Sequence, residues 1–130
     1  MVNRFLDWFK QAEADVRHAA NALKDGDFEW SCFAAHQAAE KAIKAVFFKS
    51  GLDAWGHALT GLLGNFPDGA ARPAEDLVNY ARVLDKYYLP TRYPNGFDSG
   101  APTDYYTRDE ALEAIRLAEA ILEFCGHQID

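Results

Sequence analysis

Apolar side chains recur at steps of three and four residues along most of the chain, which is the pattern of amphipathic α-helices. The first such stripe predicts a helix over residues 3–24 and consists of Phe5, Phe9, Ala12, Val16, Ala19 and Leu23. Gly26 can adopt the left-handed conformation that ends a helix, and Asp27 can cap the next one. The turn between these helices is therefore short, and we expect them to run antiparallel.

The second predicted helix, residues 28–49, is rich in alanine. One of its faces carries Phe28, Cys32, Ala35, Ala39, Ala42 and Val46. Small side chains let a neighbouring helix approach closely, so we expect this helix to lie at the centre of the fold. Glu40 and Lys44 lie one turn apart in the order that favours an ion pair, which contributes about 0.2–0.5 kcal/mol on an exposed face.

Three more helices are predicted after Gly51. Residues 56–64 suggest a short helix that ends near Gly64. Pro73 fits the first turn of the next helix. The apolar stripe of that helix consists of Leu77, Tyr80, Ala81, Leu84 and Tyr88. Thr107 and Glu110 then form a capping box, the signature of a helix start, ahead of the last apolar stripe.

Residues 89–106 show no helical periodicity and contain Pro90, Pro94 and Pro102. A loop of this length is uncommon in a compact domain and is more often functional than idle. No segment shows the alternation of a strand. The sequence therefore predicts an all-α fold with one domain over residues 1–130, an antiparallel up-and-down helical bundle of four main helices plus a short helix.

The composition is that of a globular protein, because 49% of the 130 residues are hydrophobic and 25% are charged. The net charge of −7 means that any attraction to RNA or to an anionic membrane would have to be local. We therefore expect neither RNA nor a membrane as a partner. Aromatic residues make up 14% of the chain, which predicts that some of the rings lie at an interface.

Cys32 and Cys125 occur singly within apolar helical patterns, which predicts buried free thiols in a reducing compartment. The segment that follows Met1 is amphipathic and does not have the apolar core of a signal peptide. No stretch approaches the roughly 18 apolar residues that a membrane span requires. These features predict a cytoplasmic protein.

Residues 85–94 are the most informative segment, because they set one arginine among three tyrosines and two prolines. The tyrosines are Tyr87, Tyr88 and Tyr93. The prolines stiffen the segment and hold Arg92 near these rings, which could stack a base while the guanidinium binds a phosphate. The alternative is a structural arginine that lies over the end of the bundle and pairs with Asp85 or Asp98.

A second candidate for binding is a basic patch. Lys41 and Lys44 lie three residues apart on the second helix and could combine with Lys49 and Arg82. A solvated helix face is the simpler interpretation of these lysines.

The remaining polar residues favour structural roles. His36 lies one turn after Cys32, a spacing that could present both to a metal, but two ligands do not make a site. We therefore predict no metal and no cofactor, and expect His36 to hydrogen-bond a neighbour. His57 is interpreted as a cap residue or as a member of a polar seam. Asp98 and Asp104 fit turns better than a calcium loop.

Four short segments carry a resemblance that covers nearly the whole chain. They are CFAAHQAAEKAIKA at 32–45, GHAL at 56–59, YYLPTRYP at 87–94 and YT at 106–107. In this order and spacing the chain resembles the HEPN family of small prokaryotic helical bundles. The resemblance implies a homodimer that acts with a minimal nucleotidyltransferase in a two-component or toxin–antitoxin-like module, and that can bind a nucleotide.

Many HEPN proteins are metal-independent ribonucleases that use an arginine followed, after four to six residues, by a histidine. None of the arginines of this chain has a histidine at that spacing, and after Arg92 the corresponding positions hold Phe97, Asp98 and Ser99. Arg92 alone could stabilise a phosphorane but could not exchange a proton near neutral pH. We therefore predict no catalytic residue.

The leading hypothesis is a noncatalytic, homodimeric HEPN-type module that partners a minimal nucleotidyltransferase and binds a ligand or partner near Arg92. One alternative is a divergent ribonuclease that combines Arg92 with His36 or His57. The other is a nucleotide sensor that acts without a dedicated partner.

Overall fold

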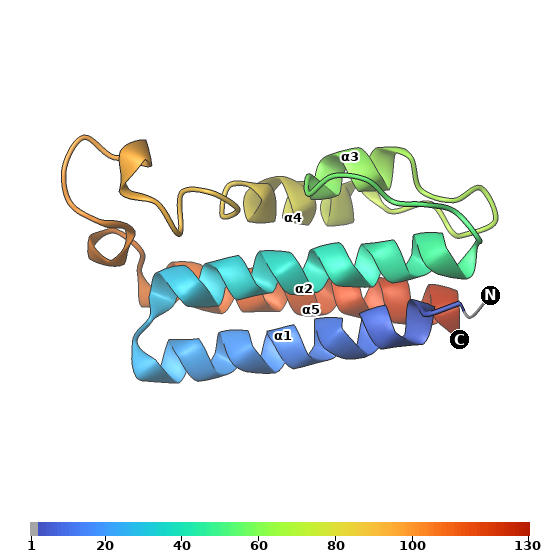
Figure 1. Cartoon of the computed structure of the whole chain (residues 1–130), viewed down its shortest axis with the longest axis horizontal. Helices are drawn as coiled ribbons and strands as arrows, with labels where there is room; N and C mark the ends of the chain where they lie inside the picture. The colour runs from blue at the N-terminus through green and yellow to red at the C-terminus, as the bar shows by residue number, and fades with distance from the viewer. Residues whose placement is uncertain (1–2) are drawn as a thin grey trace.

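The computed structural model describes residues 3–130, and every regular element within them is helical. Three long helices, α1 (Phe5–Asp25), α2 (Phe28–Lys49) and α5 (Arg108–Ile129), lie side by side. The shorter helices α3 (Leu59–Gly64) and α4 (Glu75–Asp85) lie on the side of α2 that is remote from α1 (Figure 1). The direction of the chain alternates from α1 to α2, α4 and α5, so the predicted all-α, up-and-down bundle is confirmed.

Helix α2 occupies the centre of the bundle, as its alanines predict, and packs against α1, α3, α4 and α5. Helices α2 and α5 run in the same direction yet lie in close contact. Both helices carry fully buried alanines, and such small side chains let helix backbones approach closely. The alanines are Ala35, Ala38, Ala39 and Ala42 on α2, and Ala111, Ala114 and Ala118 on α5.

The turn between α1 and α2 forms as the sequence predicts. Gly26 has a φ of 79°, and its N–H binds the last carbonyls of α1. Asp27 occupies the N-cap position of α2, but its side chain makes no capping hydrogen bond. The hydroxyl of Ser31 instead donates to the carbonyl of Ala19 at 2.8 Å and joins the two helices directly.

The short helix begins three residues later than the sequence suggests. Gly56 has a φ of 89°, which is incompatible with a right-handed helix, and α3 starts at Leu59. The carboxylate of Asp85, at the end of α4, accepts hydrogen bonds from the N–H groups of Leu59 at 2.8 Å and Thr60 at 3.1 Å. A side chain that is distant in the sequence therefore fixes the start of α3.

Helix α4 begins later and ends earlier than the sequence indicates. It begins at Glu75, so Pro73 lies outside the first turn and precedes the N-cap. It ends at Asp85, and beyond it the N–H groups of Lys86 and Tyr87 bind the carbonyls three residues back, those of Val83 and Leu84, which tightens the last turn. Tyr88 therefore lies in the turn after the helix and not on its apolar face.

The loop between α4 and α5 contains two short 3₁₀ turns, Pro94–Gly96 and Pro102–Asp104. The rings of Phe97 and Tyr105 stack across it, with 4.2 Å between centroids. Asp104 accepts a hydrogen bond from the N–H of Ala101 at 2.9 Å, which is the predicted role in a turn. The loop is thus ordered by contacts among its own side chains.

The start of α5 confirms the predicted capping box. The hydroxyl of Thr107 accepts a hydrogen bond from the N–H of Glu110 at 3.2 Å, and the carboxylate of Glu110 accepts one from the N–H of Thr107 at 3.1 Å.

Within residues 3–130, no helix is both long enough and apolar enough to cross a membrane.

Candidate functional site

Arg92 lies among aromatic rings, as the sequence predicts, but the set of rings differs. Its guanidinium carbon lies 4.2 Å from the centroid of Phe33, 4.9 Å from that of Tyr88 and 5.2 Å from that of Tyr93. Its Nε donates to the carbonyl of Tyr88 at 2.9 Å. Within residues 3–130 Arg92 forms no ion pair with a carboxylate, so the structure does not contain the pairing with Asp85 or Asp98 that the alternative interpretation required.

The ring of Tyr88 contacts Arg92 and two histidines. His57 stacks on it, with 4.9 Å between centroids and 18° between the planes, and His36 lies 5.2 Å away. We call the group formed by Phe33, His36, Glu40, His57, Tyr88 and Arg92 the Tyr88 cluster. Helix α2 supplies three of its members, and the others come from the segments that flank α3 and α4.

A buried carboxylate orients His57. Both side-chain oxygens of Glu40 lie 3.1 Å from Nδ1 of His57, and Glu40 is 5% exposed. Lys44, which is also buried, donates to Glu40 at 3.1 Å. Because Nδ1 is the donor to this carboxylate, Nε2 of His57 is left to accept a hydrogen bond from a ligand. Of the two interpretations of His57, a cap residue or a member of a polar seam, the contact with Glu40 agrees with the second.

His36 is the fully buried member of the Tyr88 cluster. Its Nδ1 lies 3.2 Å from the amide nitrogen of Gln37 and accepts from it, so Nε2 carries the proton. Nε2 lies 3.3 Å from Oδ1 of Asp85, so the two groups are in polar contact, although the angle is outside that of a hydrogen bond. The expected hydrogen bond from His36 to a neighbour is therefore found with Gln37.

Burial raises the pKa of Asp85, but the polar groups that surround its carboxylate lower it by more. The contributors are His36, the backbone N–H groups of Leu59 and Thr60, and the hydroxyl of Thr60. The net result is a pKa below the ordinary value. Asp85 is therefore a carboxylate that joins α2, α3 and α4 beside the cluster.

Two of the tyrosines that the sequence places near Arg92 have different surroundings. Tyr93 is half exposed beside Arg92, whereas Tyr87 is buried and packs against Tyr106. Burial is the main cause that raises the pKa of the Tyr87 hydroxyl well above its usual range, so Tyr87 remains neutral. Phe33 takes the place at Arg92 that the sequence assigned to Tyr87.

The predicted basic residues each have a different partner. Lys41 pairs with Asp15 of α1 at 2.6 Å, and Lys44 pairs with Glu40. Lys44 is buried, so the interpretation of both lysines as a solvated face is wrong for Lys44. Lys49 binds carbonyls at the end of α5, and Arg82 binds Asn79.

Both cysteines are buried free thiols, as predicted. Burial, together with the nearby carboxylates of Glu110 and Glu29, raises the pKa of the Cys32 thiol to about 12. Burial also raises the pKa of Cys125. The described residues contain no group of three side chains placed to hold a metal ion.

A protein-family model described as the HEPN domain matches residues 5–128. The chain belongs to the HEPN family. Among curated proteins, this HEPN domain is 27% identical over 124 residues to "Putative toxin MJ1304" of Methanocaldococcus jannaschii, and the match covers 89% of this chain and 82% of that protein.

Solved HEPN-like structures agree with the fold. TT1696 from Thermus thermophilus has a TM-score of 0.94 and 48% identity, with 98% of this chain and 99% of that chain covered. ST0689, an archaeal HEPN homologue, has a TM-score of 0.83 and 38% identity, with coverage of 99% and 100%. An HEPN domain protein from Thermotoga maritima has a TM-score of 0.75 and 35% identity, with coverage of 93% and 95%.

The HEPN fold places Arg92 and His57 on one ring, although no arginine of the chain has a histidine at the family's usual spacing. Phe33 and Glu40 complete the arrangement, and both lie on α2. Sequence reasoning missed these two because an aromatic residue and a glutamate on a helix carry no signal until the packing partner is known.

Proposed function

We propose that this protein is a noncatalytic, homodimeric HEPN module that acts in the cytoplasm with a minimal nucleotidyltransferase, and that the Tyr88 cluster binds a nucleotide. The observation that carries the proposal is the environment of the Arg92 side chain. Its guanidinium lies among three aromatic rings, partly exposed, and has no carboxylate partner within residues 3–130. Such a group is suited to a phosphate beside a stacked base.

The surroundings of Arg92 support an interface as well. Three large apolar or aromatic side chains near it are about half exposed: Trp30 at 47%, Leu89 at 55% and Tyr93 at 49%. Trp30 packs edge-on against Phe33. Exposed aromatic side chains of this kind are enriched at the centres of interfaces, which supports assignment of this surface to the homodimer or to the partner.

The relative from Methanocaldococcus jannaschii is named as a toxin candidate, and this supports a toxin–antitoxin-like setting. The first test is affinity purification of the tagged protein from its host, with mass spectrometry of the bait and of the proteins that accompany it. A nucleotidyltransferase in stoichiometric amount is the expected result. Its absence would contradict the two-component proposal, and a monomer at tens of micromolar in sedimentation would contradict the homodimer.

Nucleotide binding is tested by titration with ATP, GTP and their mono- and diphosphates. Arg92→Ala is expected to weaken binding by about tenfold or more, because it removes a charge-assisted contact. Arg82→Ala is the matched control, because Arg82 is exposed on α4 and contacts Asn79. Both variants are expected to melt like the wild type. Equal binding by all three proteins would contradict a site at Arg92.

A second candidate function is RNA cleavage, and one observation favours it. His57 and Arg92 contact the same ring of Tyr88, and Glu40 orients His57. This pair would supply a proton-exchanging group and a cation for the phosphorane. Cleavage of RNA in EDTA that is lost in both His57→Gln and Arg92→Ala would establish this function. Absence of cleavage by the wild type would eliminate it.

A further inference from the structure

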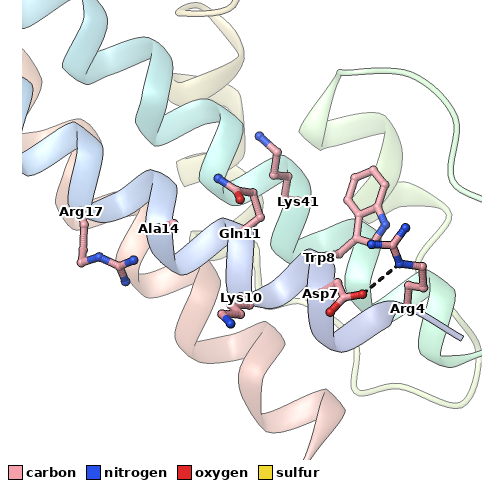
Figure 2. Close-up of a pocket in the computed structure, with 8 residues that line it drawn as sticks. All are labelled: Arg4, Asp7, Trp8, Lys10, Gln11, Ala14, Arg17 and Lys41. Atoms are coloured by element: carbon pink, nitrogen blue, oxygen red, sulfur yellow. Dashed lines mark hydrogen bonds and ion pairs between the residues drawn. The ribbon is translucent and has the colours of Figure 1, made fainter.

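A shallow pocket of about 530 Å³ lies along the exposed side of α1 (Figure 2). We call it the α1 groove, and it is lined by Arg4, Asp7, Trp8, Lys10, Gln11, Ala14, Arg17 and Lys41. Figure 2 shows Trp8, Gln11 and Lys41 along one rim, with Arg17 and Lys10 along the other. Ala14 leaves the floor open because its side chain is a single methyl group between longer ones.

The charge of the groove is opposite to that of the whole protein. Its lining contains four cations and one carboxylate, whereas the chain carries a net charge of −7. Two of the cations are already paired, Arg4 with Asp7 at 2.9 Å and Lys41 with Asp15 at 2.6 Å. Neither Lys10 nor Arg17 has an ion-pair partner among the residues that the structure describes, and both are exposed.

The spacing of these two cations fits another helix. Lys10 and Arg17 lie seven residues apart on α1, which is two turns and about 10 Å along the axis. Acidic residues spaced by two turns on a helix laid alongside α1 would meet both cations. Ala14 lies between them along α1 (Figure 2) and lines the pocket, so its small side chain leaves room for a larger side chain of that helix.

One end of the groove combines an aromatic ring with the Arg4–Asp7 ion pair. Trp8 is half-buried and is fixed by edge-on packing against Phe48, with 5.0 Å between ring centroids. A second hollow shares Arg4 and Trp8 with the groove and continues to Phe48 and Leu52. Leu52 is 47% exposed. An occupant therefore meets apolar side chains beside the Arg4–Asp7 pair at one end and the free cations Lys10 and Arg17 along its length.

We propose that the α1 groove docks an acidic amphipathic helix of the partner protein, an inference that rests on the proposed two-component function. Charge complementarity favours this occupant. A nucleic acid would need unpaired cations along a longer path, and half of the cations here are already neutralised by Asp7 and Asp15. A helix with two acidic residues needs only the two that remain, Lys10 and Arg17.

The first test uses synthetic helical peptides of about 20 residues, long enough to span the groove. One carries glutamates two turns apart on its polar face, and its control carries glutamines there. The wild type is expected to bind the glutamate peptide about tenfold more tightly than the glutamine peptide. Lys10→Glu with Arg17→Glu is expected to abolish that difference.

The matched control is Lys24→Glu with Lys86→Glu, which changes the net charge equally at exposed sites outside the groove. It is expected to keep the preference for the glutamate peptide. Equal binding of the two peptides by the wild type would overturn the inference, as would an equal loss in the control variant. Tighter binding of a single-stranded oligouridylate than of the peptide, or dissociation of a self-dimer by the groove variant alone, would assign the groove to another occupant.

The same variants, used as tagged baits in the native host, separate this inference from the proposed function. A nucleotidyltransferase that accompanies the wild type and the control variant but not the groove variant supports both. One that accompanies all three leaves the two-component function standing and overturns the role of the groove. If none accompanies the wild type, the two-component function fails, and the peptide titration alone decides the groove.

Discussion

The imidazole of His57 stacks on the ring of Tyr88, with 4.9 Å between their centroids and 18° between their planes. The carboxylate of Glu40 binds Nδ1 of that imidazole, and the guanidinium carbon of Arg92 lies 4.9 Å from the centroid of the same tyrosine ring. A carboxylate, an imidazole, a phenol ring and a guanidinium therefore form one continuous chain of contacts. Its first two links join different segments of the fold, whereas Tyr88 and Arg92 lie four residues apart in the loop after α4.

The buried pair of Glu40 and Lys44 gives the first prediction. Glu40→Ala leaves the ammonium of Lys44 buried without its partner, and we expect the free energy of unfolding to fall by about 3 kcal/mol. Replacement of both residues by methionine should recover most of the loss, because no buried charge then remains. Urea denaturation measures all three proteins. An unchanged midpoint in Glu40→Ala would show that Lys44 reaches water.

His57→Ala provides the control for that experiment. The side chain of His57 is 55% exposed, so its ion pair with Glu40 should contribute less than about 1 kcal/mol. A loss as large as that of Glu40→Ala would mean that the stacking on Tyr88, and not the pair with Lys44, dominates the stability of the cluster.

The lowered pKa of Asp85 predicts a dependence of stability on pH. A carboxyl group whose pKa is lower in the folded state than in the unfolded state stabilises the fold above its ordinary value of about 3.9. That contribution is lost as the pH falls through the lowered value. The difference in stability between the wild type and Asp85→Asn should therefore be constant above about pH 5 and shrink in more acidic solution. A difference that grows with acid would contradict the assignment.

The close approach of α2 and α5 predicts intolerance of larger side chains. Ala39 is fully buried, and Ala39→Leu should destabilise the protein by about 1–3 kcal/mol through overpacking. Ala120→Leu on α5 is the control, because Ala120 is only partly buried. Thermal melting compares the two variants. Equal melting temperatures would show that α2 and α5 can separate without cost.

Gly100 gives a prediction for the long loop. Its φ is 79°, and a Cβ at this position would lie 3.2 Å from the Tyr105 ring and 3.1 Å from the Asp104 carboxylate. Gly100→Ala should therefore cost about 1–2 kcal/mol, because it combines a left-handed backbone with a close contact. Gly69→Ala meets nothing within 4 Å and is the control. Hydrogen exchange of the loop amides would show whether the effect is local.

The sequence predicts the helices well where the determining interactions are local. The stop at Gly26 and the capping box of Thr107 and Glu110 each involve residues close together in the chain, and both are found. The ends of α3 and α4 are predicted less well. Asp85 caps α3 from 26 residues away, and no local pattern contains that information.

The features of the candidate site also fall into those that the sequence predicts and those that depend on tertiary packing. The sequence by itself determined the helical class, the central position of the alanine-rich helix and the presence of Arg92 beside Tyr88, because periodicity, side-chain size and proline act locally. Only the tertiary structure decided that Phe33 replaces Tyr87 at the guanidinium and that Glu40 holds His57. Those contacts depend on how helices are rotated and aligned against one another, which is set by packing over the whole core.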